Sequence, residues 1–171
     1  GIPNFQLVPG YYHTICASIN SAVVHGIHSN RKLEAGDLLS VDCGAEVDGW
    51  NGDSAFSIVV RGDTSELAVQ RQVQSDVCQG SLWAGIAAFA GASRLNEVGI
   101  AVKQHIKSKG PYSILQEYIG HGIGRTMHEE PAVFNYRTKD AGPKGEAWMC
   151  IAIEPMITAG DQQTCIQDDD W

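Results

Sequence analysis

The chain has 171 residues, of which 20 are acidic and 12 are basic, and its formal net charge at pH 7 is −8. This length suits a single domain, residues 1–171, that is long enough to bury a hydrophobic core. The acidic balance and the lack of a Lys/Arg cluster argue against a nucleic-acid partner. No apolar run reaches the roughly 18 residues of a membrane helix, so we expect no membrane partner either.

The five cysteines indicate the redox environment. They are odd in number, widely spaced and include no C-x-x-C pair. This usage favours free thiols in a reducing compartment, and no charged-then-apolar leader follows Gly1. We therefore predict a cytoplasmic protein.

A β-hairpin is the clearest local signal. After a short predicted strand over 14–20, the segments 38–47 and 50–60 have the composition of strands and are separated only by Asp48-Gly49. This dipeptide is typical of a two-residue hairpin turn. The sequence therefore predicts two antiparallel strands in a fixed register.

The predicted register brings two aspartates onto one face of the hairpin. A two-residue turn pairs Gly44 with Asp53 and Asp42 with Ala55. Asp42 and Asp53 are then diagonal neighbours, roughly 7–8 Å apart at the backbone. Gly44 has no side chain to fill the space between them, so the arrangement leaves room for a cation.

The opposite face of the hairpin is predicted to be a core face. Its side chains are Val41, Cys43, Ala45, Val47, Phe56, Ile58 and Val60. The carboxylate face also carries small and apolar residues, and no Lys or Arg lies nearby in sequence. Either both aspartates lie on a solvent-facing sheet surface, or they are half-buried and need a cationic partner, of which a metal is the simplest.

Two helices are predicted in the middle of the chain. The first begins near Thr64, where Asp63 and Glu66 resemble a capping box, and Gly85 is expected to loosen its end. Its predicted buried side chains are Leu67, Val69, Val73, Val77 and Trp83.

The second helix is predicted over 93–110. Ser93 is its expected N-cap and Gly110 its stop. Its predicted apolar stripe consists of Leu95, Val98, Val102 and Ile106. Further strands are expected around 115–119, 132–136 and 147–157, so the order of elements predicts an α+β domain with helices packed on one face of a mostly antiparallel sheet.

Two histidines lie seven residues apart in the glycine-rich stretch "YIGHGIGRTMHEEP". The glycines disfavour a helix, and a continuous strand would send His121 and His128 to opposite faces. Either the two histidines are unrelated, or a turn between them aims both at one place.

Glu154 is a third carboxylate, at the end of the apolar stretch "MCIAI". It is either a surface residue at a strand end or a ligand, because an acidic side chain there is costly unless it is paired. Together with Asp42, Asp53 and His121 it forms an oxygen-rich donor set with one imidazole. Such a set suits Mn, Fe, Co or Zn, and carboxylates can bridge two ions.

Five ordered motifs resemble the methionine aminopeptidase family. They are "HGI" at 25–27, "VDCGAEVDGWNGD" at 41–53, "GHGIG" at 120–124, "HEEP" at 128–131 and "IEPM" at 153–156. The separations of Asp42 from Asp53 by 11 residues and of His121 from Glu154 by 33 residues are similar to those of the compact bacterial-type (type I) enzymes. Type II enzymes carry an insertion between the last two motifs, which this chain lacks.

This resemblance implies the pita-bread fold and a two-metal hydrolase that removes the initiator methionine from nascent proteins. Asp42, Asp53, His121 and Glu154 match the family's metal ligands, and His25 and His128 match the histidines that bind the substrate and the transition state. The methionine pocket would be formed by Tyr11, Cys16, Met127 and Trp171, with Phe5 as a looser match. Ordinary core packing is the alternative for the pocket residues.

The implied mechanism uses two divalent ions, which lower the pKa of a bridging water so that hydroxide attacks the scissile carbonyl. Glu154 would take the proton of this water and pass it to the leaving amine, and His128 would donate to the developing oxyanion. The implied partners are the N-terminal methionine of peptides and nascent proteins and, transiently, the ribosome. We expect a monomer.

The chain also departs from the family pattern. The family has one more ligand, a glutamate that bridges both metals, in a motif beyond the position of Trp171, and a helical segment ahead of the position of Gly1. We therefore expect the domain to be incomplete at both ends. Two alternatives stay open: a proline-directed aminopeptidase of the same fold, and a non-catalytic binding protein or inactive fragment that lacks the bridging glutamate.

Overall fold

The computed structural model describes residues 1–166, and the predicted pocket residue Trp171 lies outside this range. The described residues form two compact units, one of residues 1–75 with 164–166, and one of residues 76–163. The expected single domain stays a prediction. No helix in the described range is both long and apolar enough to cross a membrane, and no disulfide joins any of the five cysteines.

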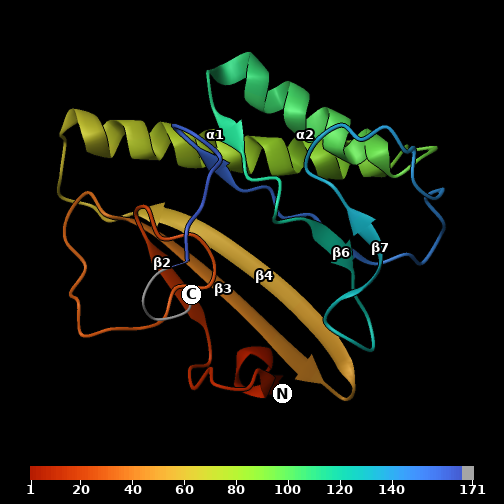
Figure 1. Cartoon of the computed structure of the whole chain (residues 1–171), viewed down its shortest axis with the longest axis horizontal. Helices are drawn as coiled ribbons and strands as arrows, with labels where there is room; N and C mark the ends of the chain where they lie inside the picture. The colour runs from red at the N-terminus through yellow and green to blue at the C-terminus, as the bar shows by residue number, and fades with distance from the viewer. Residues whose placement is uncertain (167–171) are drawn as a thin grey trace. The chain divides into compact units, whose positions relative to one another are not determined.

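The first unit is built on an antiparallel sheet around one long hairpin (Figure 1). Its strands are β1 (Ile2–Pro3), β2 (Cys16–Ile19), β3 (Leu38–Val47) and β4 (Trp50–Val59), and a short 3₁₀ helix, η1 (Asn4–Leu7), follows β1. β1 and β2 pair with successive parts of β3, while β4 pairs with β3 over its whole length. The predicted strand over 14–20 and the predicted hairpin are both present.

The turn of the hairpin has the predicted two-residue geometry. Asp48 and Gly49 both have positive φ, at 53° and 76°, which is the backbone of a type I′ turn. The register pairs Gly44 with Asp53 and Asp42 with Ala55, as predicted. Asp42 and Asp53 are therefore diagonal neighbours on one face.

The predicted core face of this hairpin is largely exposed, so this prediction is wrong. Val47, Phe56 and Ile58 are 54%, 55% and 47% exposed, and Cys43 and Ala45 are exposed as well. The alternation of apolar residues identified which side chains share a face. It could not identify whether another part of the molecule covers that face.

Helix α1 (Glu66–Phe89) begins within two residues of its predicted start. The Ala68 N–H donates to Ser65 Oγ, so Ser65 caps the helix instead of the predicted box. The predicted buried stripe is wrong for four of its five members. Val77 is buried, whereas the exposed side chains are Leu67, Val69, Val73 and Trp83.

The core of the second unit lies between the later part of α1, helix α2 (Asn96–Lys109) and short strands. The predicted stripe of α2, with Leu95 ahead of it, is confirmed, because Leu95, Val98, Val102 and Ile106 are 0–3% exposed. Gly85 does not loosen α1. A Cβ at this position would lie only 2.9 Å from Val102 Cγ2, so the glycine permits close packing of the two helices.

The start of α2 also differs from the prediction. The Glu97 carboxylate accepts hydrogen bonds from the backbone N–H groups of Ser93 and Arg94 and from the Ser93 hydroxyl. Ser93 is therefore held by Glu97 and does not cap the helix amides itself.

Two small antiparallel sheets complete the second unit. β6 (Gly120–Gly122) is the central strand of one sheet, between β7 (Glu129–Val133) and β8 (Ile151–Ala152), and β5 (Ser113–Ile114) pairs with β9 (Ile157–Thr158) in the other. The strands are shorter than predicted and shifted along the chain. The predicted α+β class is confirmed, with antiparallel strands throughout.

Candidate active site

His121 occupies the middle of the central strand β6 and is buried. Its glycine neighbours permit this close packing, because a Cβ at Gly120 would overlap the carbonyl oxygen of Ala152 on β8. The His121 Nδ1 lies 2.9 Å from the Gly122 carbonyl oxygen, which can only accept, so Nδ1 carries the proton in this hydrogen bond. In the neutral ring Nε2 then carries the lone pair that can bind a metal.

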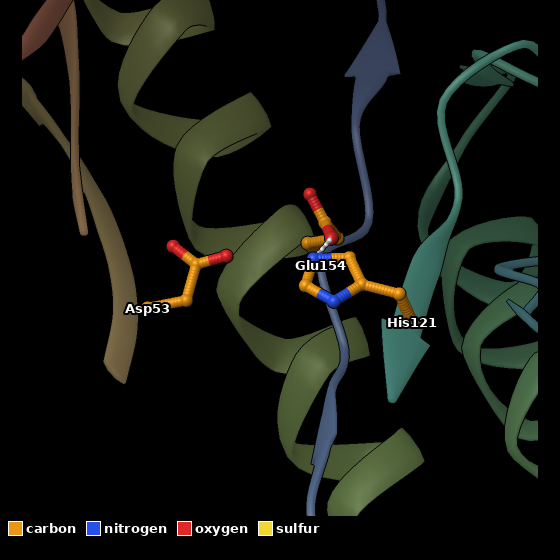
Figure 2. Close-up of side chains that lie close together, drawn as sticks. All are labelled: Asp53, His121 and Glu154. Atoms are coloured by element: carbon orange, nitrogen blue, oxygen red, sulfur yellow. Dashed lines mark ion pairs between the residues drawn. The ribbon is translucent and has the colours of Figure 1, made fainter. Parts of the chain in front are cut away.

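Glu154 meets His121 across this sheet. It follows β8 by two residues, and its Oε1 lies 3.2 Å from His121 Nε2, a contact that is an ion pair when the imidazole is protonated. Figure 2 shows this contact, and it also labels Asp53 on β4 of the first unit. The structure thus brings together two of the predicted ligands from segments that are far apart in sequence.

His128 lies beside His121, as the turn hypothesis predicted. The chain reverses between β6 and β7, and the Thr126 N–H donates to Glu129 Oε1 at 2.7 Å within this turn. The two imidazole rings are in edge contact, with centroids 4.4 Å apart. His128 itself is exposed, which suits a side chain that contacts a substrate.

The first unit holds the other predicted ligands. Asp42 on β3 is partly buried and stands opposite Cys16 of β2, while Asp53 on β4 is exposed. The residue opposite Asp53 is the buried Gly44, as predicted. The two carboxylates therefore share one face of a rigid hairpin.

Several predicted pocket residues form one cluster near Asp42. The Tyr11 hydroxyl is within hydrogen-bonding distance of the carbonyl oxygens of Ile15 and Gly26, at 3.1 Å from each. The Phe5 ring lies 5.1 Å from the Tyr11 ring and 5.4 Å from the His25 ring. Phe5, Tyr11 and His25 are thus in contact within one unit.

Burial keeps the Tyr11 hydroxyl and the Cys16 thiol, which both lie near Asp42, uncharged. Burial, together with the nearby Cys16 and Asp42, raises the pKa of Tyr11 to about 12. Burial is also the main cause that raises the pKa of the Cys16 thiol, and the charge of Asp42 adds to it. The Cys16 thiol is therefore uncharged, and it acts as a small apolar side chain opposite Asp42 and not as a nucleophile.

The predicted site residues divide between the two units. Phe5, Tyr11, Cys16, His25, Asp42 and Asp53 belong to the first unit, and His121, Met127, His128 and Glu154 belong to the second. Sequence reasoning missed Asn135, which is fully buried and hydrogen-bonded to the backbone of Glu154. The available signal was a polar residue within the otherwise apolar stretch "AVFNY".

Comparison with known proteins defines the class. The family model described as metallopeptidase family M24 matches residues 6–170, and the chain belongs to this family. Within it, the chain is similar to methionine aminopeptidases. It is 39% identical to the methionine aminopeptidase of Clostridium acetobutylicum, in a match that covers 99% of this chain and 66% of the relative. It is 41% identical to methionine aminopeptidase 1 of Mycobacterium tuberculosis, in a match that covers 99% of this chain and 64% of the relative. The chain thus spans slightly less than two thirds of the length of these relatives.

Solved structures give the same fold. The methionine aminopeptidase of Thermotoga maritima matches with a TM-score of 0.88 and 33% identity, covering 99% of this chain and 66% of that one. A prolidase from Pyrococcus furiosus matches less well, with a TM-score of 0.59 and 25% identity, covering 90% of this chain and 41% of that one. The predicted pita-bread fold is confirmed.

Proposed function

We propose that this chain acts as a methionine aminopeptidase, a metal-dependent hydrolase that removes the N-terminal methionine from peptides and nascent proteins. The observation that carries this proposal is the 3.2 Å separation of His121 Nε2 from Glu154 Oε1, with His128 in ring contact with His121. These residues lie in a chain that belongs to a metallopeptidase family and is similar to methionine aminopeptidases. Transient ribosome contact, a monomeric state and a cytoplasmic location stay predictions.

The proposed metal ligands are Asp42, Asp53, His121 and Glu154. Three carboxylates and one imidazole fit two divalent ions such as Co, Mn, Fe or Zn, and the Nδ1 hydrogen bond of His121 leaves Nε2 as the donor atom. When bound, such ions supply a Lewis acid and a water that is readily deprotonated near neutral pH.

The remaining chemistry belongs to side chains. Glu154 accepts the proton of the attacking water and returns it to the leaving amine. His128 donates a hydrogen bond to the scissile carbonyl oxygen as negative charge develops there, an interaction that typically contributes about 3–4 kcal/mol. His25 binds the substrate, and its ring contact with Phe5 supports this placement.

The proposed methionine pocket consists of Phe5, Tyr11, Cys16, Met127 and Trp171. The contacts between Phe5 and Tyr11 and the neutral state of the Cys16 thiol support an apolar pocket wall. An unbranched thioether side chain suits such a wall, because sulfur makes favourable contacts with aromatic rings.

The test is methionine release with defined peptides and metals. The chain is freed of metal, supplied with Mn²⁺ or Co²⁺, and incubated with Met-Ala-Ser and with Ala-Pro-Ser. We expect release from the first peptide only. Release from the second peptide instead would support the proline-directed alternative, and metal binding without release from either would support a non-catalytic protein.

Two variants separate the roles of the histidines. His121→Ala should lose bound metal and activity together. His128→Ala should retain metal but lower kcat by a factor of roughly 100–1,000, as expected for loss of one preorganised donor. Loss of metal from His128→Ala would make it a ligand and would contradict the proposed role.

A further inference from the structure

Asn135 is a buried side chain that joins the segment leading into β6 to the segment that follows β8. It is fully buried, and its Nδ2 donates hydrogen bonds to the carbonyl oxygens of Glu154 at 3.1 Å and Tyr118 at 3.4 Å. Its Oδ1 is also buried and has no hydrogen-bond partner among residues 1–166. The two carbonyl acceptors fix the orientation of the amide, because a flipped amide would set oxygen against oxygen.

The position of Asn135 in the sheet explains why an amide is needed there. The register Gly120↔Val133 between β6 and β7, continued by two residues, sets Asn135 opposite Tyr118. The ladder between β6 and β8 ends at His121↔Ala152, two residues before Glu154. Asn135 therefore supplies side-chain hydrogen bonds at the end of the sheet where the backbone ladders have stopped.

We propose that Asn135 is a positioning residue for the metal site. By holding the backbone of Glu154 and the segment that leads into β6, it sets the distance between the Glu154 carboxylate and the His121 ring before a metal binds. This inference rests on the proposed function, because it assigns metal-ligand roles to His121 and Glu154. The partnerless Oδ1 supports a specific role, since a buried amide oxygen without a hydrogen bond is costly and an apolar side chain would avoid that cost.

The direct test measures metal affinity. Asn135→Ala removes both hydrogen bonds, so calorimetric titration of the metal-free chain with Mn²⁺ should show a Kd raised roughly 10- to 100-fold, as is typical for partners that orient metal ligands. Asn135→Ser serves as a milder variant if the alanine variant does not fold. Wild-type affinity in a folded Asn135 variant would overturn the proposal.

A matched control separates positioning from general stability. Ser81 is also fully buried in the second unit, and its hydroxyl donates to the Cys78 carbonyl oxygen at 2.7 Å. Ser81→Ala should leave the Kd for Mn²⁺ unchanged even if it lowers the melting temperature. An equal rise of the Kd in Ser81→Ala would show that any loss of core hydrogen bonding weakens the site, which would also overturn the proposal.

Two further measurements tie the effect to Glu154 and separate it from the proposed function. In a Glu154→Ala background, Asn135→Ala should raise the Kd by a smaller factor than it does in the wild type, whereas an equal factor in both backgrounds would contradict action through Glu154. If the wild-type chain binds no Mn²⁺, the proposed function fails. Amide hydrogen exchange of the metal-free chain then tests separately whether Asn135 holds the strands in place. Faster amide exchange of residues 120–122 and 151–152 in Asn135→Ala than in Ser81→Ala would show that Asn135 positions these strands. Equal exchange in the two variants would exclude this role.

Discussion

At the scale of single residues, Asp37 shows how one carboxylate organises the loop ahead of β3. Its oxygens accept hydrogen bonds from Arg31 Nη2 at 2.9 Å, from the Glu34 N–H at 2.9 Å and from Asn20 Nδ2 at 2.8 Å. The hydrogen bond from Arg31 is the largest of the causes that hold the pKa of Asp37 well below its usual range. All three donors favour the ionised form.

This arrangement predicts a defined pH dependence of stability. Because the pKa of Asp37 is lower in the folded than in the unfolded chain, its contribution is present above the unfolded pKa of about 3.9 and is lost as the pH falls further. Asp37→Asn should lower the denaturant midpoint at pH 7, and the difference from the wild type should shrink below about pH 4. Asp140→Asn, at an exposed position, is the control. A difference that stays constant down to pH 3 would contradict the assignment.

At the scale of elements, the β3–β4 hairpin depends on its turn. Gly49 has a φ of 76°, in the left-handed region that a side chain disfavours by about 1–2 kcal/mol. Gly49→Ala should therefore lower the free energy of unfolding by about that amount, measured by denaturant titration. Gly52→Ala in the same hairpin is the control, because a Cβ there meets no atom within 4 Å and its φ is not positive. An equal loss in both variants would show that turn geometry is not the cause.

The elements also differ in how far they could be predicted from sequence. The hairpin register and the stripe of α2 were predictable because each follows from a local period, two residues for a strand and 3.6 for a helix. The exposure of Phe56 on β4 and of Leu67 on α1 was not, because burial depends on which other element packs there. The hydrogen bonds of Asn135 were not predictable for a related reason. Its two acceptors lie 17 and 19 residues away in sequence and are close to it only in the folded chain.

At the scale of the whole molecule, each compact unit contains two of the four proposed metal ligands. Asp42 and Asp53 come from the hairpin of the first unit, and His121 and Glu154 come from the sheet of the second. The sequence predicts all four in two ways: carboxylates and an imidazole in these contexts are costly unless they are paired or bound, and the motif order and spacing resemble those of methionine aminopeptidases. Their roles as ligands stay predictions. The geometry within each unit, such as the 3.2 Å separation of His121 Nε2 from Glu154 Oε1, required the fold.

The proposed ligand set predicts that metal stabilises the chain only when Asp53 and His121 are both present. A ligand that binds the folded but not the unfolded chain, at a free concentration of 100 times its Kd, raises the free energy of unfolding by about 2.7 kcal/mol. Denaturant titration with Mn²⁺ at 100 times the measured Kd should show this increase for the wild type. His121→Ala and Asp53→Asn should each abolish it or reduce it strongly, whereas Asp161→Asn, at an exposed position, should retain it. If Asp53→Asn keeps the full increase while His121→Ala loses it, the second unit binds the metal alone, and Asp53 in the first unit is not a ligand.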